Sequence, residues 1–190
     1  MQNSLVVDGG TLGPAYLVRL RPATLDDTEL LNLWSSSEEY TGRFNDFGAT
    51  QVPKADEPIG AKGLAAQHGG GTLLVERLPD HEPVGTVSWR QVHYGPNPES
   101  LAWQIGINLI PEARGRGFGG QAQRLLVDYL FSTTPVKRIE AATDIDNLAE
   151  QRALEKAGFI REGVLRGAQY RAGTWHDLVF YSVVRVAEKT

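Results

Sequence analysis

The feature that most constrains the fold is a strand, a glycine-rich turn and a helix that follow one another between Leu101 and Phe131. Apolar residues alternate with small or polar ones from Leu101 to Ile110, which predicts a half-buried strand. Apolar side chains then recur at helical spacing up to Phe131, behind a turn that holds four glycines and two arginines between Arg114 and Gly120. Because glycines let a ligand approach the backbone and a helix N-terminus presents free N–H groups, this turn suits a phosphate or a pyrophosphate.

The turn by itself leaves other interpretations open. Gly115, Gly117 and Gly120 fit the spacing of a dinucleotide-binding fingerprint, but that fingerprint belongs to the first strand–helix–strand unit of a domain. Here the turn comes after more than half of the chain. A Walker A loop would need Gly-Lys followed by Ser or Thr, which the sequence lacks. An ordinary surface turn with charges for solubility is the remaining alternative.

Composition narrows the class of protein. The chain has 190 residues, 41% of them hydrophobic, which suits one domain with a substantial core. Its net charge of −4 argues against a nucleic-acid partner, because nucleic-acid binders usually present a basic face. There is no cysteine, and His68, His81 and His93 lack the spacing of metal ligands, so we expect no metal. We find no signal peptide and no run of 18 apolar residues, and we expect a cytoplasmic protein without a membrane contact.

Hydrophobic periodicity predicts about seven strands and four helices in an α/β sheet of mixed strand direction. Residues 1–15 are expected to form a loose tail and residues 16–190 a single domain. Glu38 to Pro58 has no regular pattern, and such a stretch is often functional or mobile. Predicted strands cover Tyr16–Arg21, Thr72–Arg77, Val84–Tyr94, Leu101–Ile110, Val136–Thr143, Phe159–Leu165 and Thr174–Val186, the last two joined by a connection over Arg166–Gly173; predicted helices follow the cap Thr24, span Ile59–Gln67, follow the glycine turn, and run from the cap Asn147 to Gly158.

Three blocks of sequence together resemble one family. The first is Arg-x-x-Gly-x-Gly from Arg114 to Gly119, the second runs from Asp146 to Phe159, and the third runs from Glu162 to Tyr181. They resemble the GNAT superfamily of N-acetyltransferases, and the third is similar to the branch that acetylates ribosomal-protein N-termini (RimJ/RimL type). The resemblance covers Val18 to Arg185, nearly the whole chain.

This resemblance implies a fold in which the fourth and fifth strands splay apart and acetyl-CoA enters the gap. Its pantetheine arm would pair with the fourth strand over Ile107–Ile110, and Pro111 fits the end of pairing there. The pyrophosphate would lie on Arg114–Gly119, while Asn147 would reach the cofactor or, with Glu150, only cap the next helix. The cofactor-binding residues implied by the resemblance are Ile107, Leu109, Ile110, Arg114, Gly115, Arg116, Gly117, Phe118, Gly119, Gly120, Asn147, Arg152 and Lys156.

The chain departs from the resembled family at the positions that usually handle protons. Glu150 stands where relatives have a serine that protonates the leaving thiolate. Gln104 and Gln169 stand where relatives often have glutamates, the one at Gln169 acting as a base. Three interpretations stay open: Glu150 takes over part of the acid–base work, a residue of the aromatic wall or the last strands does so, or water removes the proton and positioning does the rest.

The other catalytic candidates also follow from the resemblance. A backbone N–H near Asn108 or Leu109 would stabilise the oxyanion. His176 and Asp177 are adjacent in a predicted strand and so face opposite ways, which excludes a simple dyad and favours Asp177 as a structural partner of the preceding loop. The catalytic residues we predict are Asn108, Glu150, Tyr170 and Tyr181, with His176 and Asp177 as weaker candidates.

The function implied is acetyl-CoA-dependent N-acetylation of a primary amine by direct attack in a ternary complex. The acceptor is expected to be a small molecule or a protein N-terminus, with one wall of its site in Glu38–Pro58. One alternative is a non-catalytic acyl-CoA binding module, motivated by the missing acids. Another is an acyltransferase with a longer donor such as succinyl-CoA. A monomer or a homodimer is expected.

Overall fold

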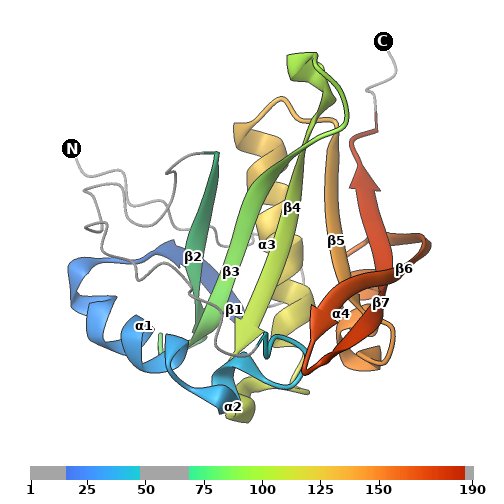
Figure 1. The fold of residues 1–190 in the computed structure, drawn as a ribbon. Coiled ribbons are helices and arrows are strands. Elements are labelled where there is room, and N and C mark those ends of the chain that lie inside the picture. The colour runs from blue at the N-terminus through green and yellow to red at the C-terminus, as the bar shows by residue number, and fades with distance from the viewer. Residues whose placement is uncertain (1–15, 48–68, 187–190) are drawn as a thin grey trace.

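The computed structural model describes residues 16–47 and 69–186, which form one seven-stranded sheet with helices against it (Figure 1). The predicted tail 1–15, the predicted helix 59–67 and residues 48–58 of the irregular segment lie outside the described residues. The strands are β1 (Val18–Pro22), β2 (Gly70–Arg77), β3 (Pro83–His93), β4 (Leu101–Leu109), β5 (Arg138–Asp144), β6 (Ile160–Arg171) and β7 (Thr174–Val184); the α-helices are α1 (Thr28–Ser35), α2 (Glu38–Thr41), α3 (Phe118–Thr133) and α4 (Leu148–Lys156), with single 3-10 turns at Leu25–Asp27, Pro98–Ser100 and Pro111–Ala113.

The sheet has the strand order β1-β2-β3-β4-β5-β7-β6, and β4 and β5 are its parallel pair. A parallel pair needs a crossover connection, and α3 provides it. β4 and β5 pair only at Trp103↔Ile139 and Gln104↔Glu140, although β4 continues to Leu109. The carboxyl-terminal half of β4 therefore has no β5 partner, and the predicted splay between the fourth and fifth strands is confirmed (Figure 1).

Alternation along the strands decides which face each helix covers. In β2, Leu73 and Val75 belong to the main core together with α3 and α4, whereas Leu74 belongs to a second cluster with Trp34 and Tyr40. Because successive strand residues point to opposite faces, α1 and α2 cover the face that α3 and α4 leave open. The rings of Trp34 and Tyr40 stack with centroids 5.0 Å apart and fix α2 against the lower end of β4 in Figure 1.

The last two strands form a longer hairpin than the sequence predicts. The expected connection over residues 166–173 is wrong, because β6 continues to Arg171 and the turn consists of Ala172 and Gly173, both with positive φ. The register shifts between Leu165 and Gln169, around Gly167 at φ 56°. This irregularity interrupts the alternation, so a strand that pairs across to β7 resembled a loop in the sequence.

Two local predictions in this part of the chain are confirmed. The Gly167 N–H donates to Asp177 Oδ1 at 2.7 Å, so Asp177 does hold the preceding segment. Gly158 has φ 95° directly after the C-cap residue of α4, as expected for a glycine that ends a helix. In the described part of the chain, every helix is too short or too polar to cross a membrane.

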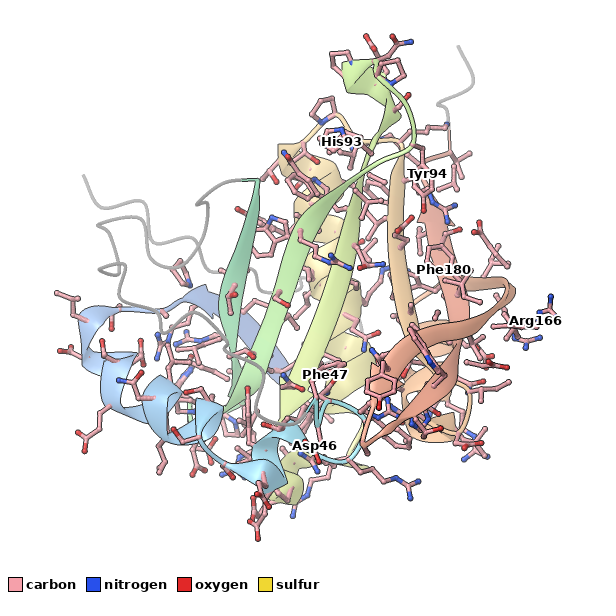
Figure 2. The ribbon with its side chains drawn as sticks, viewed as in Figure 1. Asp46, Phe47, His93, Tyr94, Arg166 and Phe180 are labelled. Atoms are coloured by element: carbon pink, nitrogen blue, oxygen red, sulfur yellow. The ribbon has the colours of Figure 1, made fainter. Side chains whose placement is uncertain are left out.

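A polar cluster surrounds the buried carboxylate of Glu140 on β5. Tyr94 donates to it at 2.6 Å, Arg138 at 3.0 Å and the Gln104 amide at 3.4 Å. The Arg138 guanidinium also lies 5.8 Å from the ring centroid of Tyr94 and 5.6 Å from that of Phe180, two residues labelled in Figure 2. Gln104, which the resemblance marked as a neutral replacement for a glutamate, is thus tied into this cluster.

Candidate active site

A cavity of about 120 Å³ lies in the gap where β4 and β5 separate. Strands and helices both supply its walls: Ile107 comes from β4, Thr143 from β5, Gln169 from β6, Leu178 from β7, Gln123 from α3 and Glu150 from α4. Asn45, in the segment after α2, lies at its edge and donates from its amide to the side chain of Asn108 at 3.1 Å. The gap is therefore a pocket enclosed by helices on one side and by the segment after α2 on the other.

The backbone of β4 presents alternate residues to this gap. Ile110 donates its N–H to Val84 of β3 at 2.9 Å, so in this antiparallel pair Ile110 and Asn108 direct their backbone groups toward β3. Ile107 and Leu109 then turn theirs toward the gap, as expected for both. The register with β3 uses the N–H groups of Ile110 and Asn108 inside the sheet, which leaves Leu109 as the other N–H predicted for the oxyanion; a contact of Ile110 with the cofactor stays a prediction.

The glycine turn has the backbone shape that the sequence predicted. Gly115 and Gly117 have φ of 73° and 84°, and Gly117 is the N-cap of α3. A Cβ at either position would meet nothing within 4 Å, so the left-handed backbone, not a lack of space, requires glycine there. A Cβ at Gly120 would lie 3.3 Å from the carbonyl oxygen of Ala153, so this glycine lets α3 pack closely on α4.

Arg114 does something that its sequence position did not indicate. Its guanidinium donates to the carbonyl oxygens of Leu109 at 3.0 Å, Glu39 at 2.6 Å and Tyr40 at 3.0 Å. The side chain therefore joins the glycine turn to the end of α2 and to the last residue of β4. Its contact with a phosphate stays a prediction, as does that of Arg116, which is exposed.

Glu150 directs its carboxyl group into the cavity. The predicted cap is confirmed for Asn147, whose Oδ1 accepts from the Glu150 N–H at 3.3 Å. The Glu150 side chain, however, accepts at 2.6 Å from the amide of Gln123. Burial raises the pKa of Glu150 from 4.5 to about 7, although the bond from Gln123 works in the opposite direction. A carboxyl group with that pKa both accepts and donates protons near neutral pH.

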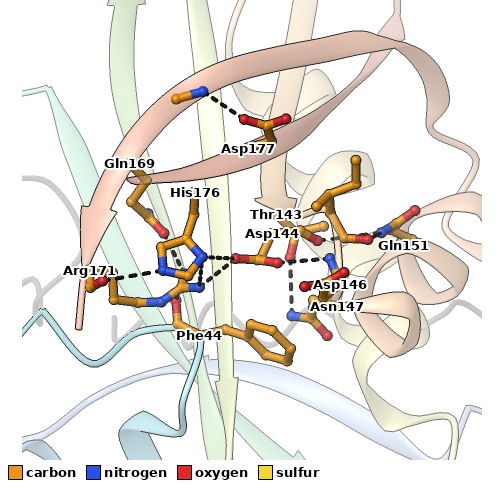
Figure 3. A network of polar contacts seen from close by, with 12 residues as sticks. Phe44, Thr143, Asp144, Asp146, Asn147, Gln151, Gln169, Arg171, His176 and Asp177 are labelled. Atoms are coloured by element: carbon orange, nitrogen blue, oxygen red, sulfur yellow. Dashed lines mark hydrogen bonds and ion pairs between the residues drawn. The ribbon is translucent and has the colours of Figure 1, made fainter. Parts of the chain in front are cut away.

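A buried ion pair beside the cavity connects three strands with the segment after α2 (Figure 3). Arg171 on β6 donates to Asp144 at the end of β5, and also to the carbonyl oxygen of Phe44 at 3.0 Å and to Gln169 at 2.7 Å. Burial works to raise the pKa of Asp144, but the bonds from Arg171 and from the Asp146 N–H lower it below its usual range. Because the turn through Asp146 leads into α4, the pair positions Glu150 and the Phe44 segment together.

His176 belongs to the same network and not to the cavity lining. Its Nδ1 lies 3.1 Å from a guanidinium nitrogen of Arg171 and its Nε2 lies 3.2 Å from the Arg171 carbonyl oxygen. Its Nδ1 also lies 3.3 Å from the Asp144 carboxylate, so the ring contacts both members of the ion pair. These contacts indicate that His176 supports the ion pair of Arg171 and Asp144.

Two predicted catalytic tyrosines lie away from the cavity. Tyr170 is 57% exposed and packs edge-on against Trp175, while its neighbour Gln169 lines the cavity from the opposite side of the strand. Tyr181 is fully buried in the core, and its hydroxyl donates to Glu155 at 3.3 Å. Burial, together with Glu155, raises the pKa of Tyr181. The structure does not bring either hydroxyl to Glu150. On α4, the predicted cofactor residues Arg152 and Lys156 are exposed.

A wider hollow of about 580 Å³ adjoins the cavity on the open face of β2, β3 and β4. It is lined by residues 69–71 and by Ser88 and Arg90, and it shares Ile105 and Gly106 with the cavity. A molecule bound in the hollow would reach the gap over Gly106, which has no side chain to block the way.

Gln123 is the residue that sequence reasoning missed. It is almost completely buried on α3, among apolar neighbours that include Ala122 and Leu126. A glutamine on the buried face of an amphipathic helix is a signal that could have found it, because buried polar side chains need partners.

Comparison with known proteins agrees with the geometry. The family model described as an acetyltransferase (GNAT) domain matches residues 18–160. The chain belongs to this family. It is 31% identical over 170 residues to the uncharacterized N-acetyltransferase YoaA of Bacillus subtilis, covering 89% of this chain and 94% of that protein. The family and such relatives identify the chain as an N-acetyltransferase.

Solved structures share the fold. RimL, a ribosomal L7/L12 α-N-protein acetyltransferase solved with coenzyme A, superposes with a TM-score of 0.73 at 19% identity, covering 94% of this chain and 97% of that one. Spermidine N-acetyltransferase from Vibrio cholerae, solved with CoA and spermine, gives a TM-score of 0.71 at 16% identity, covering 88% and 95%. The mixed seven-stranded sheet with four helices is therefore the GNAT fold.

Proposed function

We propose that this N-acetyltransferase moves an acetyl group from acetyl-CoA to a primary amine, and that Glu150 carries the proton. The observation behind the proposal is a carboxyl group with a pKa near 7 in the gap between β4 and β5. Acetyl-CoA supplies an acyl group activated as a thioester. During transfer the amine nitrogen forms a bond to the acyl carbon, and the bond from that carbon to sulfur breaks.

The residues around the gap fit such a donor. The left-handed glycine turn at the start of α3 suits its phosphates, since N–H groups of a helix N-terminus face that turn. The edge of β4 at Ile107 and Leu109, which has no β5 partner, suits the amides of its arm, although the Leu109 carbonyl oxygen already accepts from Arg114. An N–H of the same edge, at Leu109 or Ile107, is available to the carbonyl oxygen that becomes negative during attack.

In this proposal Glu150 acts first as a general base and then as a general acid. In its ionised form it accepts the proton that the amine nitrogen loses on bonding to the acyl carbon, and in its protonated form it returns that proton to the departing sulfur. One carboxyl group thus replaces the separate acid and base positions, where this chain has Glu150, Gln104 and Gln169. Gln104 and Gln169 are both engaged in hydrogen bonds with other side chains.

The charge in the cavity lining favours an uncharged acyl group, because a second carboxylate beside Glu150 would be repelled whenever Glu150 is ionised. An acetyl group is uncharged, whereas a succinyl group has a carboxylate that would lie beside Glu150. This argues for acetyl-CoA over succinyl-CoA as the donor.

The acceptor is a primary amine of a small molecule or of a protein N-terminus, and the hollow on β2, β3 and β4 is its route to the gap. Both acceptor types occur among proteins of this fold, since RimL is described as a protein acetyltransferase and another neighbour as a spermidine acetyltransferase. A cytoplasmic location and a monomeric or homodimeric state belong to the same proposal.

The test combines binding with turnover. Calorimetric titration with acetyl-CoA is followed by a thiol-release assay over amines, polyamines and N-terminal peptides. The variant Glu150→Gln should keep binding acetyl-CoA but lose at least about 100-fold in turnover. Glu155→Gln on the same helix, whose carboxylate is exposed and receives the Tyr181 hydroxyl, is the matched control and should keep its activity.

Three results would count against the proposal. Wild-type protein that binds no acetyl-CoA would contradict the enzyme assignment of the gap. Equal turnover in Glu150→Gln and wild type would remove Glu150 from the proton path and favour water as the base. Acetyl-CoA binding without thiol release on any acceptor class would favour a binding module, for which the neutral Gln104 and Gln169 are the motivation.

A further inference from the structure

Among the described residues, only one of the two polar groups of the Gln123 side-chain amide has a hydrogen-bond partner. Its amide nitrogen donates to Glu150 at 2.6 Å. Its carbonyl oxygen is buried and, within the described residues, has no hydrogen-bond partner. The side chain is 1% exposed, so bulk water does not satisfy this oxygen.

A buried carbonyl oxygen without a donor is costly, and native proteins contain few of them. One end of the amide is a donor and the other an acceptor, so its orientation decides which group Glu150 meets. If the amide were reversed, two oxygens would face each other whenever Glu150 is ionised. The bond to Glu150 therefore fixes which way the amide points, and it leaves the buried carbonyl oxygen of this cavity-lining side chain without a donor.

The cavity needs a ligand with an N–H group to satisfy that acceptor. Gln123 lies on α3 just after the glycine turn, so an arm that runs from phosphates on the turn into the gap passes it. The arm of coenzyme A carries two secondary amides, and each has one N–H donor. The adjoining edge of β4, at Ile107 and Leu109, offers backbone groups to the same arm.

We propose that Gln123 is a positioning residue with two tasks: its carbonyl oxygen accepts a hydrogen bond from an amide N–H of the bound CoA arm, and its amide nitrogen holds the Glu150 carboxylate in place. This inference rests on the proposed function. It links donor binding to the group that moves the proton, since the same side chain contacts both.

Among the groups around Glu150, Gln123 is the one whose hydrogen bond lowers the pKa of Glu150. The side chains that line the cavity with it are Asn147 from its own helix, Thr143 and Asp144 from β5, and Gln169 from β6. Asp144 is the other carboxylate in this lining, and Arg171 pairs with it. The bond from Gln123 is the interaction that favours the ionised form of Glu150, so its loss should shift proton transfer to higher pH.

The experiment uses Gln123→Met, which keeps the length of the side chain and removes both its donor and its acceptor. The matched control is Gln121→Met, two residues away on α3. The Gln121 side chain accepts from the Leu17 N–H at 2.7 Å and so fixes β1, outside the cavity. Binding of CoA and of adenosine 3′,5′-diphosphate, which keeps two of the three phosphates of CoA and lacks the arm, is measured by calorimetry.

Gln123→Met should weaken CoA binding by about three- to tenfold, the usual value of one hydrogen bond, and leave adenosine 3′,5′-diphosphate binding unchanged. The acid limb of its kcat/KM profile should move to higher pH. Gln121→Met should change neither. Gln123→Glu separates the two tasks, because it keeps an oxygen acceptor but replaces the amide donor with a second carboxyl group, which raises the pKa of Glu150. Measured at pH 6, it should retain CoA affinity while its acid limb shifts to higher pH.

Three outcomes would overturn the inference without touching the proposed function. They are an unchanged ratio of CoA to adenosine 3′,5′-diphosphate affinity in Gln123→Met, an unchanged acid limb in both Gln123 variants, or the same losses in Gln121→Met. Failure of the proposed function is seen separately, in wild-type protein that binds no CoA or releases no thiol.

Discussion

Replacing Glu150 by glutamine should stabilise the protein at alkaline pH while it removes activity. The folded state holds the pKa of this carboxyl group at about 7, against an ordinary value of 4.5. Between these two values the folded state binds more protons than the unfolded state, so the free energy of unfolding falls as pH rises. The cost of burying this group is nearly absent below pH 4.5 and complete above about pH 7.

The size of the effect follows from the same two values. The linkage relation gives a cost of about 1 kcal/mol at pH 5 and about 3 kcal/mol at pH 8. Glutamine has no charge to bury and can still accept a hydrogen bond from the Gln123 amide. The stability difference between Glu150→Gln and wild type should therefore increase by about 2–3 kcal/mol from pH 5 to pH 8, in favour of the variant.

Urea unfolding of both proteins at several pH values between 5 and 8 measures this difference. Glu155→Gln serves as the control, since Glu155 is exposed on the same helix and its replacement should give a difference that stays constant with pH. A Glu150→Gln difference that is also constant would refute the reasoning, because it would mean that Glu150 is as well solvated in the folded protein as in the unfolded chain. Such a result would remove the basis for Glu150 as a proton carrier at neutral pH.

Two further predictions address the glycine turn and the buried ion pair. Gly117→Ala should cost about 1 kcal/mol of stability through backbone strain and weaken acetyl-CoA binding measured by calorimetry. The control Gly167→Ala, also at positive φ with open space around it, should lose a similar amount of stability in thermal unfolding and keep its affinity for acetyl-CoA. Equal affinity losses in both variants would show a general effect of strain. Arg171→Met should destabilise the protein by about 3–5 kcal/mol in urea unfolding, because it leaves the Asp144 carboxylate buried without its cation. The double variant with Asp144→Asn should recover part of that loss, and a purely additive result would contradict the pairing.

Local sequence patterns predicted much of this fold because they depend on neighbours in the chain. The alternation through Ile105 and Ile107, the glycines that need positive φ, and the cap at Asn147 are each settled within a few residues. The β6–β7 hairpin was predicted too short for the same reason. Its continuation past Gly167 depends on pairing with β7, and the local pattern there is that of a loop.

The site could be predicted only in part, because its decisive contacts join distant residues. Gln123 and Glu150 are 27 positions apart, and Arg171 contacts the Phe44 carbonyl across 127 positions. No periodicity encodes such pairs. The resemblance supplied the glycine turn and the Glu150 position, yet it also placed Tyr170 and Tyr181 among the catalytic candidates, and burial and strand direction put both hydroxyls elsewhere.

The neutral residues at the expected acid positions become understandable once the cavity is considered as a whole. A glutamate at 169 would compete with Asp144 for Arg171 and would bring a second negative charge into the lining of the Glu150 cavity. Like charges that share a site push a carboxyl pKa further up, so Glu150 would stay protonated at neutral pH and could no longer accept a proton from the amine. With glutamine there, burial and the single bond from Gln123 set the pKa near 7. In the proposed mechanism, the absence of the usual acids is thus what allows Glu150 to serve as both acid and base.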